Sequence, residues 1–174
     1  MGLFGRKKKE PEKKQEERIT FDSPLGTFYY INNPPTDEYG YEGSIIWKAS
    51  GTSEEETSVY IDADSPDTTQ AGLCYSRLEA LVADQNRVED ENTDLIAAHF
   101  MSMPDMIATG YNRNTCSDDM TLIWLGVFRN GDTQFSYDSA GIYADDICLT
   151  IHADGSKEIE YISDYETHVD KLQT

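Results

Sequence analysis

The chain has few basic residues outside its first 18 positions. Residues 1–18 contain seven Lys or Arg and four Glu, whereas the other 156 residues contain seven Lys or Arg and 29 Asp or Glu, a net charge of −22. Proteins that bind nucleic acid need clustered Lys and Arg to neutralise phosphates. The composition therefore argues against a nucleic-acid-binding domain, and it favours a basic protein partner, divalent ions or solubility alone.

Long apolar runs and paired cysteines are also lacking. No segment approaches the roughly 18 apolar residues that a transmembrane helix needs, and no apolar segment typical of a secretory signal is found. The three cysteines, Cys74, Cys116 and Cys148, are odd in number and far apart, which does not fit a disulfide framework. We therefore expect a protein of the reducing cytoplasm.

Motifs for phosphate and metal binding are absent. The chain contains no GxxxxGK[ST] and no GxGxxG after a predicted strand. Asp62, Asp64 and Asp67 are spaced like calcium ligands. An EF-hand loop that began at Asp62 would need glycine in place of Asp67 and a bidentate acid in place of Leu73. These acids are better explained by a helix that begins at Pro66 or nearby, with Ser65 or Asp67 as its cap, so we predict no metal ion and no cofactor.

No catalytic residues are predicted either. Cys116 with His99 or His152 would supply a nucleophile and a base, but no family signature surrounds this cysteine. Cys148 and His152 would stand roughly 13 Å apart on a strand, too far to share a zinc ion. His99 lies among predicted core residues without a second ligand at metal spacing, and we expect it to be structural. A role other than catalysis is expected.

What the chain does contain is an aromatic stretch, residues 21–47, with seven of its nineteen aromatic residues. Alternating apolar residues and intervening turn residues predict four strands of a meander in this region and just after it. Their centres are near Phe21, Tyr29, Gly43 and Tyr60. Residues 120–128 are apolar on both faces, which is typical of a strand covered on each side. We expect the aromatic stretch to supply the layer that faces it.

Two helices are predicted between these regions. Apolar residues recur at helical spacing over residues 68–84 and about 89–103, and Pro104 forbids continuation of the second helix. Residues 105–118 are predicted to be a loop. Asn130-Gly131 predicts a type I′ hairpin turn, and Asp154-Gly155 predicts another turn, so a second meander of about four strands closes the chain.

The predicted fold class is α+β, with two antiparallel β-meanders and an inserted pair of helices packed on the sheet. Residues 19–163 form a single domain, residues 1–18 a disordered basic tail, and residues 164–174 a C-terminal tail or a short helix. The basic tail offers one route to a membrane, because Leu3 and Phe4 precede a run of basic residues. One short apolar pair is a marginal anchor, and the acidic domain opposes approach to anionic lipid.

Short motifs in the chain resemble a group of bacterial families. They are LGTF (25–28), YEGSIIW (41–47) and, after the helical pair, GIYADDICLTIHADGS (141–156). They are similar to the LGxF start, the EGxxxW strand and the late F-x-G-H-x-I-x-V-x-x-x-x-DG hairpin of the bacterial domains of unknown function numbered 2004, 2262 and their relatives. The Gly-His of the late motif falls on Ala144-Asp145, so a role of that histidine does not transfer.

This resemblance covers residues 19–163. It implies a small bacterial cytoplasmic α+β domain, of a kind whose genes are often found near toxin and immunity loci, and it implies no enzymatic activity.

We therefore expect a protein that acts by protein interaction, in its most specific form an immunity-like inhibitor of a cationic toxin. The predicted contact residues are three acidic clusters: Glu54, Glu55 and Glu56; Asp62, Asp64 and Asp67; Glu89, Asp90 and Glu91. The alternative is a small-ligand-binding or enzymatic domain in which Tyr39, Tyr41 and Trp47 line an aromatic cleft. The same three aromatic residues would otherwise fill the core.

Overall fold

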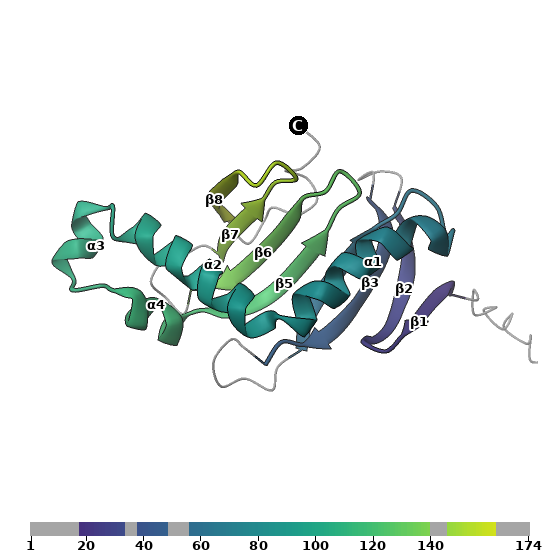
Figure 1. Cartoon of the computed structure of the whole chain (residues 1–174), viewed down its shortest axis with the longest axis horizontal. Helices are drawn as coiled ribbons and strands as arrows, with labels where there is room; N and C mark the ends of the chain where they lie inside the picture. The colour runs from purple at the N-terminus through teal and green to yellow at the C-terminus, as the bar shows by residue number, and fades with distance from the viewer. Residues whose placement is uncertain (1–17, 34–37, 49–55, 140–145, 163–174) are drawn as a thin grey trace, which may run out of the picture.

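The computed structural model describes residues 18–33, 38–48, 56–139 and 146–162, which form eight strands and four helices (Figure 1). In chain order the elements are β1 (Thr20–Ser23), β2 (Gly26–Asn33), β3 (Glu38–Ile46), β4 (Glu56–Asp62), α1 (Thr68–Ala83), α2 (Gln85–Phe100), α3 (Pro104–Ala108), α4 (Arg113–Asp119), β5 (Thr121–Val127), β6 (Thr133–Asp138), β7 (Asp146–Ile151) and β8 (Lys157–Ile162). The predicted α+β class is confirmed. The predicted tails lie outside the described residues, apart from Arg18.

All eight strands belong to one sheet, in which their order in space is their order along the chain. Neighbours within β1–β4 and within β5–β8 are antiparallel, so both predicted meanders are present. The meanders join through β4 and β5, which run parallel with Val59 opposite Leu125. The expectation that the aromatic stretch faces residues 120–128 as a separate layer is therefore wrong. Parallel neighbours need a crossover connection, and the helices provide it.

Helices α1 and α2 lie across one face of the sheet (Figure 1). The buried side of α1 carries Ala71, Cys74, Tyr75 and Leu78, which recur at helical spacing. Asp67 caps the helix, because its side chain accepts a hydrogen bond from the Thr69 N–H. The position of α1 thus follows from one apolar stripe and one cap, as the sequence predicts.

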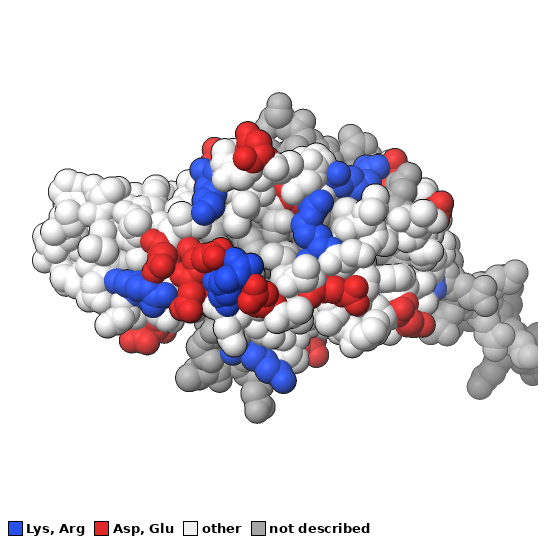
Figure 2. Space-filling model, viewed as in Figure 1, with Lys and Arg blue, Asp and Glu red and all other residues white. Residues whose placement is uncertain are grey.

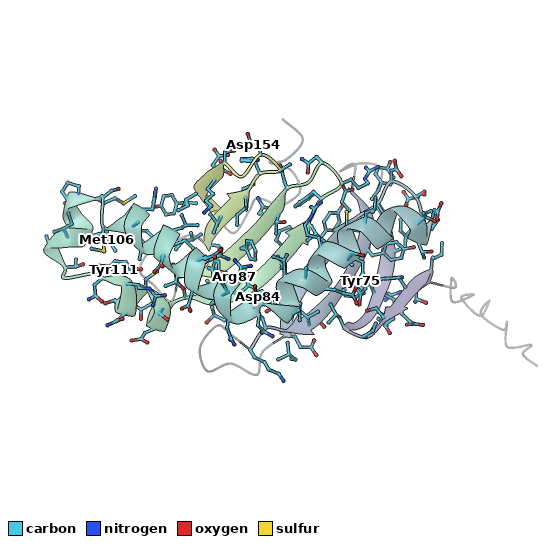
Figure 3. All side chains as sticks on the ribbon, viewed as in Figure 1. Tyr75, Asp84, Arg87, Met106, Tyr111 and Asp154 are labelled. Carbon is cyan, nitrogen blue, oxygen red and sulfur yellow. The ribbon has the colours of Figure 1, made fainter. Side chains whose placement is uncertain are left out.

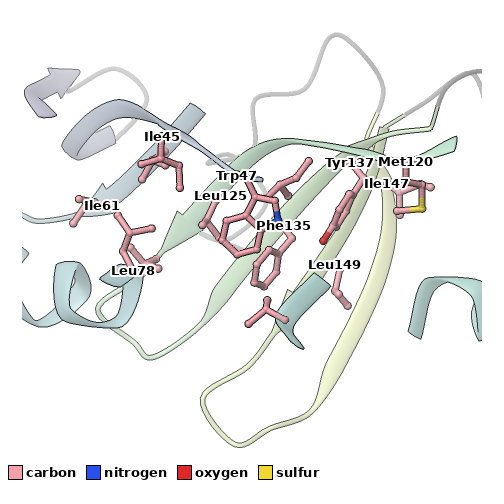
Figure 4. Packing of buried hydrophobic residues seen from close by; sticks show 14 of the residues in the cluster. Ile45, Trp47, Ile61, Leu78, Met120, Leu125, Phe135, Tyr137, Ile147 and Leu149 are labelled. Atoms are coloured by element: carbon pink, nitrogen blue, oxygen red, sulfur yellow. The ribbon is translucent and has the colours of Figure 1, made fainter. Parts of the chain in front are cut away.

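The core lies between these helices and the sheet (Figure 4). Because successive strand residues point to opposite faces, each strand contributes alternate side chains to it. The largest fully buried side chains are Trp47, Tyr41, Tyr137, Phe28, Phe100 and Phe135. Full burial of one such aliphatic or aromatic side chain contributes about 1.5–3 kcal/mol to stability.

Residues 104–108 and 113–119 are helical, so the loop predicted over residues 105–118 is wrong for most of its length. Pro104 occupies the first turn of α3, where its missing N–H costs nothing. Asn112 caps α4 by accepting hydrogen bonds from the N–H groups of Asn114 and Thr115. Both signals are present in the sequence, but helices of five and seven residues are too short to show an apolar period.

Two hairpin turns shape one end of the sheet. The turn after β5 is closed by a hydrogen bond from the Phe128 N–H to the Asp132 carbonyl, so its loop has three residues rather than the predicted two. Gly131 takes a φ of 103°, a left-handed conformation that suits glycine. In the turn after β7, His152 and Ser156 are joined in the same way and Gly155 has a φ of 83°.

No helix among the described residues is both long enough and apolar enough to cross a membrane.

Candidate functional site

The carboxyl ends of the two parallel strands, which are the central strands, lie side by side at one end of the sheet. β4 ends at Asp62, and β5 ends at Val127 just before the turn 128–132. We call Asp62–Asp64 together with the turn 128–132 the carboxyl edge. In sheets with crossover connections, ligands commonly bind outside the carboxyl ends of parallel strands. A ligand-binding site is therefore expected at the carboxyl edge.

Arg129 at the carboxyl edge binds two of the predicted contact acids. Its Nε lies 3.2 Å from an Asp62 carboxylate oxygen, and its Nη1 lies 2.5 Å from one of Asp64. The backbone N–H of Arg129 also donates to Asp62, at 3.0 Å. Among the described residues, no group of three or more His, Cys, Asp or Glu side chains is placed to hold a metal ion. These two aspartates act within the fold, fixing the turn after β5 to the end of β4.

The other acids of the first two predicted clusters have separate positions. Asp67 caps α1, and its hydrogen bonds from Thr69 lower the pKa of its carboxyl. Glu56 is exposed at the start of β4, where it accepts a hydrogen bond of 2.8 Å from the Ser44 hydroxyl. Glu54 and Glu55 lie outside the described residues. Among the described residues, the acids of these two clusters are therefore not gathered into one surface.

A cavity of about 400 Å³ opens between α1 and the carboxyl edge. It is lined by Leu73, Cys74, Arg77 and Arg129. Arg77 reaches across it from α1, and its Nη1 donates to the carbonyl oxygens of Phe128 and Asp132 at 3.0 and 3.2 Å. Basic side chains are visible here on the surface between α1 and the turn after β5 (Figure 2). No motif in the sequence points to this cavity, because the three lining residues on α1 are separated from Arg129 by 52 or more positions.

His152 forms a pair with Asp132 next to this cavity. Its Nδ1 lies 3.1 Å from Asp132 Oδ2, and its Nε2 lies 3.6 Å from Glu158 Oε2. The hydrogen bond with Asp132 is the main reason why the pKa of His152 is raised above its ordinary value. A histidine oriented by a carboxylate can serve as a general base. Here the second nitrogen faces Glu158, which makes the group an ion pair that joins β6, β7 and β8.

The histidine and cysteine pairs considered from the sequence are not formed among the described residues. His99 Nε2 lies 3.1 Å from the Tyr161 hydroxyl. Cys116 is buried, and its thiol contacts the Thr93 carbonyl oxygen and the Met120 sulfur at 3.9 and 3.2 Å. Burial raises the pKa of the Cys116 thiol, so this cysteine remains a neutral, weakly nucleophilic group.

Glu89 and Trp47, predicted for two different sites, meet inside the protein. Glu89 Oε2 accepts hydrogen bonds from Trp47 Nε1 at 2.9 Å and from the Tyr137 hydroxyl at 3.0 Å. The same hydroxyl accepts a hydrogen bond of 2.9 Å from Asn92 Nδ2. We call these four residues the Glu89 network. Burial raises the pKa of Glu89, and the two hydrogen bonds to its carboxylate oppose that shift in part.

The remaining aromatic residues of the predicted cleft are not arranged as a cleft. Tyr41 and Trp47 are 0% and 1% exposed, and the Tyr41 hydroxyl donates to the Pro66 carbonyl at 2.8 Å. The carbonyl of Tyr39 accepts a hydrogen bond of 2.8 Å from the Tyr60 hydroxyl. Tyr41 and Trp47 thus belong to the packed layer against the helices. The half-exposed aromatic of this sheet is Tyr29, on the opposite face, with Arg18 over its ring.

The neighbours of Glu89 lie on the solvent side of α2. Asp90 and Asp94 are both bound by Arg113 from α4, while Asp84 and Glu91 are both bound by Arg87. The four carboxylates are between 54% and 75% exposed. We call Asp84, Asp90, Glu91 and Asp94 the acidic face of α2. It is visible as the red and blue band across the middle of Figure 2, and Figure 3 labels Asp84 and Arg87 within it.

The acidic face leads to a part of the molecule that projects beyond the sheet. The second half of α2, α3 and α4 extend away from the strands (Figure 1), and we call residues 93–119 the helical arm. Helix α3 has no buried residue. Met101 and Ile107 are 47% and 59% exposed, while Met103 and Met106 are partly buried against the core. The end of the arm, where Figure 3 labels Met106 and Tyr111, is largely uncharged in Figure 2.

No family model, no curated protein and no solved structure matches the chain. The resemblance to the families numbered 2004 and 2262 therefore rests on its short sequence motifs, and function has to be argued from the geometry.

Proposed function

We propose that the chain is a protein-binding domain that docks a basic partner on the helical arm and the acidic face of α2. The observation that carries this proposal is the exposure of two apolar side chains close together in the arm, Met101 just after α2 and Ile107 on α3, a helix with no fully buried residue. Exposed apolar residues grouped at one end of a protein are typical of an interaction surface. Methionines suit such a surface because their side chains adapt to the partner's shape.

The charge beside the arm sets the chemistry of the partner. Four exposed carboxylates face two guanidinium groups on the acidic face of α2, which leaves it negative. Residues 19–174, which include this face, carry a net charge of −22, from seven basic and 29 acidic residues. Such a field steers a basic protein toward the surface and raises the association rate. The partner expected on the arm therefore has an apolar recess bordered by Lys or Arg.

A cationic toxin inhibited by this chain is the most specific form of the proposal. It is supported by the same charge, because a toxin with a basic active site presents the recess and border just described. An inhibitor of this kind covers the active site, so binding and inhibition should depend on the same residues of the arm.

Site-directed crosslinking tests the proposal. A photoreactive amino acid is placed at Ile107 in the full chain, and as a control at Tyr29 on the opposite face of the sheet. A protein crosslinked from Ile107 but not from Tyr29 is then purified and its binding to the chain is measured. We expect a basic partner whose affinity falls about tenfold with Ile107→Ser, because one apolar side chain is no longer buried.

The matched variants separate charge from apolar contact. Asp90→Asn combined with Asp94→Asn should reduce the association rate at low salt and have little effect at 0.5 M salt. Leu73→Ser, which changes an even more exposed apolar position on α1 (78% against 59% for Ile107), should leave binding of this partner unchanged. An acidic partner, or binding that is insensitive to both Ile107→Ser and salt, overturns the proposal. Inhibition of the partner's activity by the native chain, lost with Ile107→Ser, would support the toxin form.

A further inference from the structure

The cavity beside the carboxyl edge differs from the rest of this acidic protein in the state of its arginines. Four arginines follow position 18: Arg77, Arg87, Arg113 and Arg129. Among the described residues, three of them are each paired with two carboxylates, whereas Arg77 is paired with none. Arg77 lines the cavity, so the cavity contains a guanidinium group that has no carboxylate partner among the described residues.

The guanidinium of Arg77 is held in a fixed orientation. Both of its hydrogen bonds among the described residues are made by Nη1, to the carbonyl oxygens of Phe128 and Asp132. Its Nε and Nη2 remain for a further acceptor. A planar guanidinium binds a carboxylate through two parallel hydrogen bonds. An arginine anchored in this way loses little side-chain entropy when it binds a ligand.

The other lining residues set the charge and polarity of a ligand. Arg129 is paired with both Asp62 and Asp64, so among the described residues Arg77 is the guanidinium of this cavity that has no carboxylate partner. Burial raises the pKa of the Cys74 thiol, which therefore stays neutral. Leu73 is 78% exposed beside the cavity and provides apolar contact. A volume of about 400 Å³ lies within the range of small-molecule sites.

We propose that this cavity binds a small organic monoanion, a carboxylate with a short apolar chain, with the carboxylate on Arg77 and the chain against Leu73. The position supports this assignment, because the cavity lies at the carboxyl ends of the two parallel strands. A divalent anion such as phosphate is disfavoured, since one guanidinium charge balances only half of its charge in the field of a strongly acidic protein. The site is independent of the helical arm.

Titration of the full chain with sodium butanoate tests the site, with amide chemical shifts as the measurement and ionic strength held constant. We expect saturable shifts of amides within residues 72–78 and 128–132. Arg77→Gln should weaken butanoate binding about tenfold, because a charged pair of hydrogen bonds is lost. Arg87→Gln removes the same charge from the exposed side of α2 and should change affinity less than about twofold.

Two further measurements test the site independently of any disturbance of the turn after β5 by Arg77→Gln. Leu73→Ser lies on the surface and should weaken butanoate binding about fourfold, with no effect on acetate, because only the longer acid loses an apolar contact. Shifts that do not saturate, or that are equal in Arg77→Gln and Arg87→Gln, overturn the site. Inorganic phosphate that binds more tightly than butanoate overturns the ligand class. An effect of Leu73→Ser on butanoate alone supports both.

Discussion

Carboxylate groups on the inner and outer sides of α2 have opposite environments. Glu89 and Asp90 are neighbours in the sequence, but Glu89 points into the core while Asp90 is 75% exposed. The carboxylate of Glu89 accepts hydrogen bonds from Trp47 and Tyr137, both buried. That of Asp90 is bound by Arg113, whose side chain is 43% exposed, so that solvent is an alternative partner.

This difference separates residues that hold the fold from residues that are available to a partner. A buried acceptor that loses its hydrogen bonds cannot turn to water, so its removal is costly. An exposed ion pair exchanges readily with solvent and contributes little. The outer side of α2 is therefore the side on which charge can change without unfolding the protein, which is the property that a docking surface needs.

The largest effect is expected from Glu89→Ala. Truncation leaves Trp47 Nε1 and the Tyr137 hydroxyl without their acceptor in the core. We expect the free energy of unfolding to fall by about 2–3 kcal/mol, measured by urea denaturation at pH 7. Asp90→Ala is the matched control on the outer side. If both variants lose the same stability, the distinction between the two sides of α2 is wrong.

Glu89→Gln should change the dependence of stability on pH. The pKa of Glu89 in the folded chain is raised above its ordinary value, mainly by burial. The folded state therefore holds this proton more tightly, so the stability that Glu89 contributes is full below the unfolded pKa and is lost as pH rises through the folded pKa. Glutamine keeps an acceptor oxygen but does not titrate.

We expect the stability of the native chain relative to Glu89→Gln to decrease as the pH is raised from about 4.5 toward neutrality. Urea denaturation of both proteins across this range measures the difference and cancels the titration of all the other carboxylates. A difference that does not vary with pH would show that the carboxyl of Glu89 titrates alike in the folded and unfolded chains.

Arg113→Gln should have a smaller effect on stability than Glu89→Ala. The variant breaks the ion pairs with both Asp90 and Asp94, which are exposed. Screening by salt weakens such pairs, so the loss should shrink further in 0.5 M sodium chloride. Denaturation midpoints at low and high salt provide the measurement. A loss that is undiminished at high salt would mean that α4 depends on this arginine for packing rather than for charge.

The smallest effect is expected at the carboxyl edge, where the pair of the partly exposed His152 and the buried Asp132 can be compared with the Glu89 network. Asp132→Asn should lower the pKa of His152 toward 6.5, because the main cause of its raised value is the hydrogen bond with Asp132. Glu158→Gln should lower it less, since that contact is 3.6 Å rather than 3.1 Å. Titration of the His152 ring by NMR measures both shifts. A larger shift in Glu158→Gln would contradict the assignment.

The sign at His152 is the same as at Glu89. Its pKa is raised in the folded chain, so its contribution to stability is full below about 6.5 and is lost as pH rises through the folded pKa. Both groups therefore make the fold less stable on the alkaline side, one through burial and the other through an ion pair.

Much of the secondary structure could be predicted from residues close together in the sequence. Helix α1 begins at Thr68, as the apolar spacing predicts, and ends one residue before the predicted Asp84. The predicted start of α2, at about Glu89, lies four residues after its start in the structure at Gln85. Between Gly72 and Pro104 the chain contains neither glycine nor proline. No helix-breaking residue therefore marks the break between α1 and α2 at Asp84.

The candidate sites were harder to predict, because each of them depends on contacts between distant residues. Trp47 and Glu89 lie 42 positions apart and Arg77 and Phe128 lie 51 apart. Charge counting selected Glu89, Asp90 and Glu91 as one cluster, but it carries no information on which of them faces the core. Helical spacing alone would have set Glu89 on the same side of α2 as Asn92, which is buried.

The sequence by itself determined the strands of the two meanders, the first helix and the positions of the hairpin turns, because apolar period and turn residues act over a few positions. Only the tertiary structure decided that β4 pairs in parallel with β5, that Glu89 turns inward and that Arg77 lines a cavity with no carboxylate partner among the described residues. These outcomes depend on which distant surfaces pack together. Local pattern does not specify that choice, since the same alternation of residues is compatible with stacked sheets or with one continuous sheet.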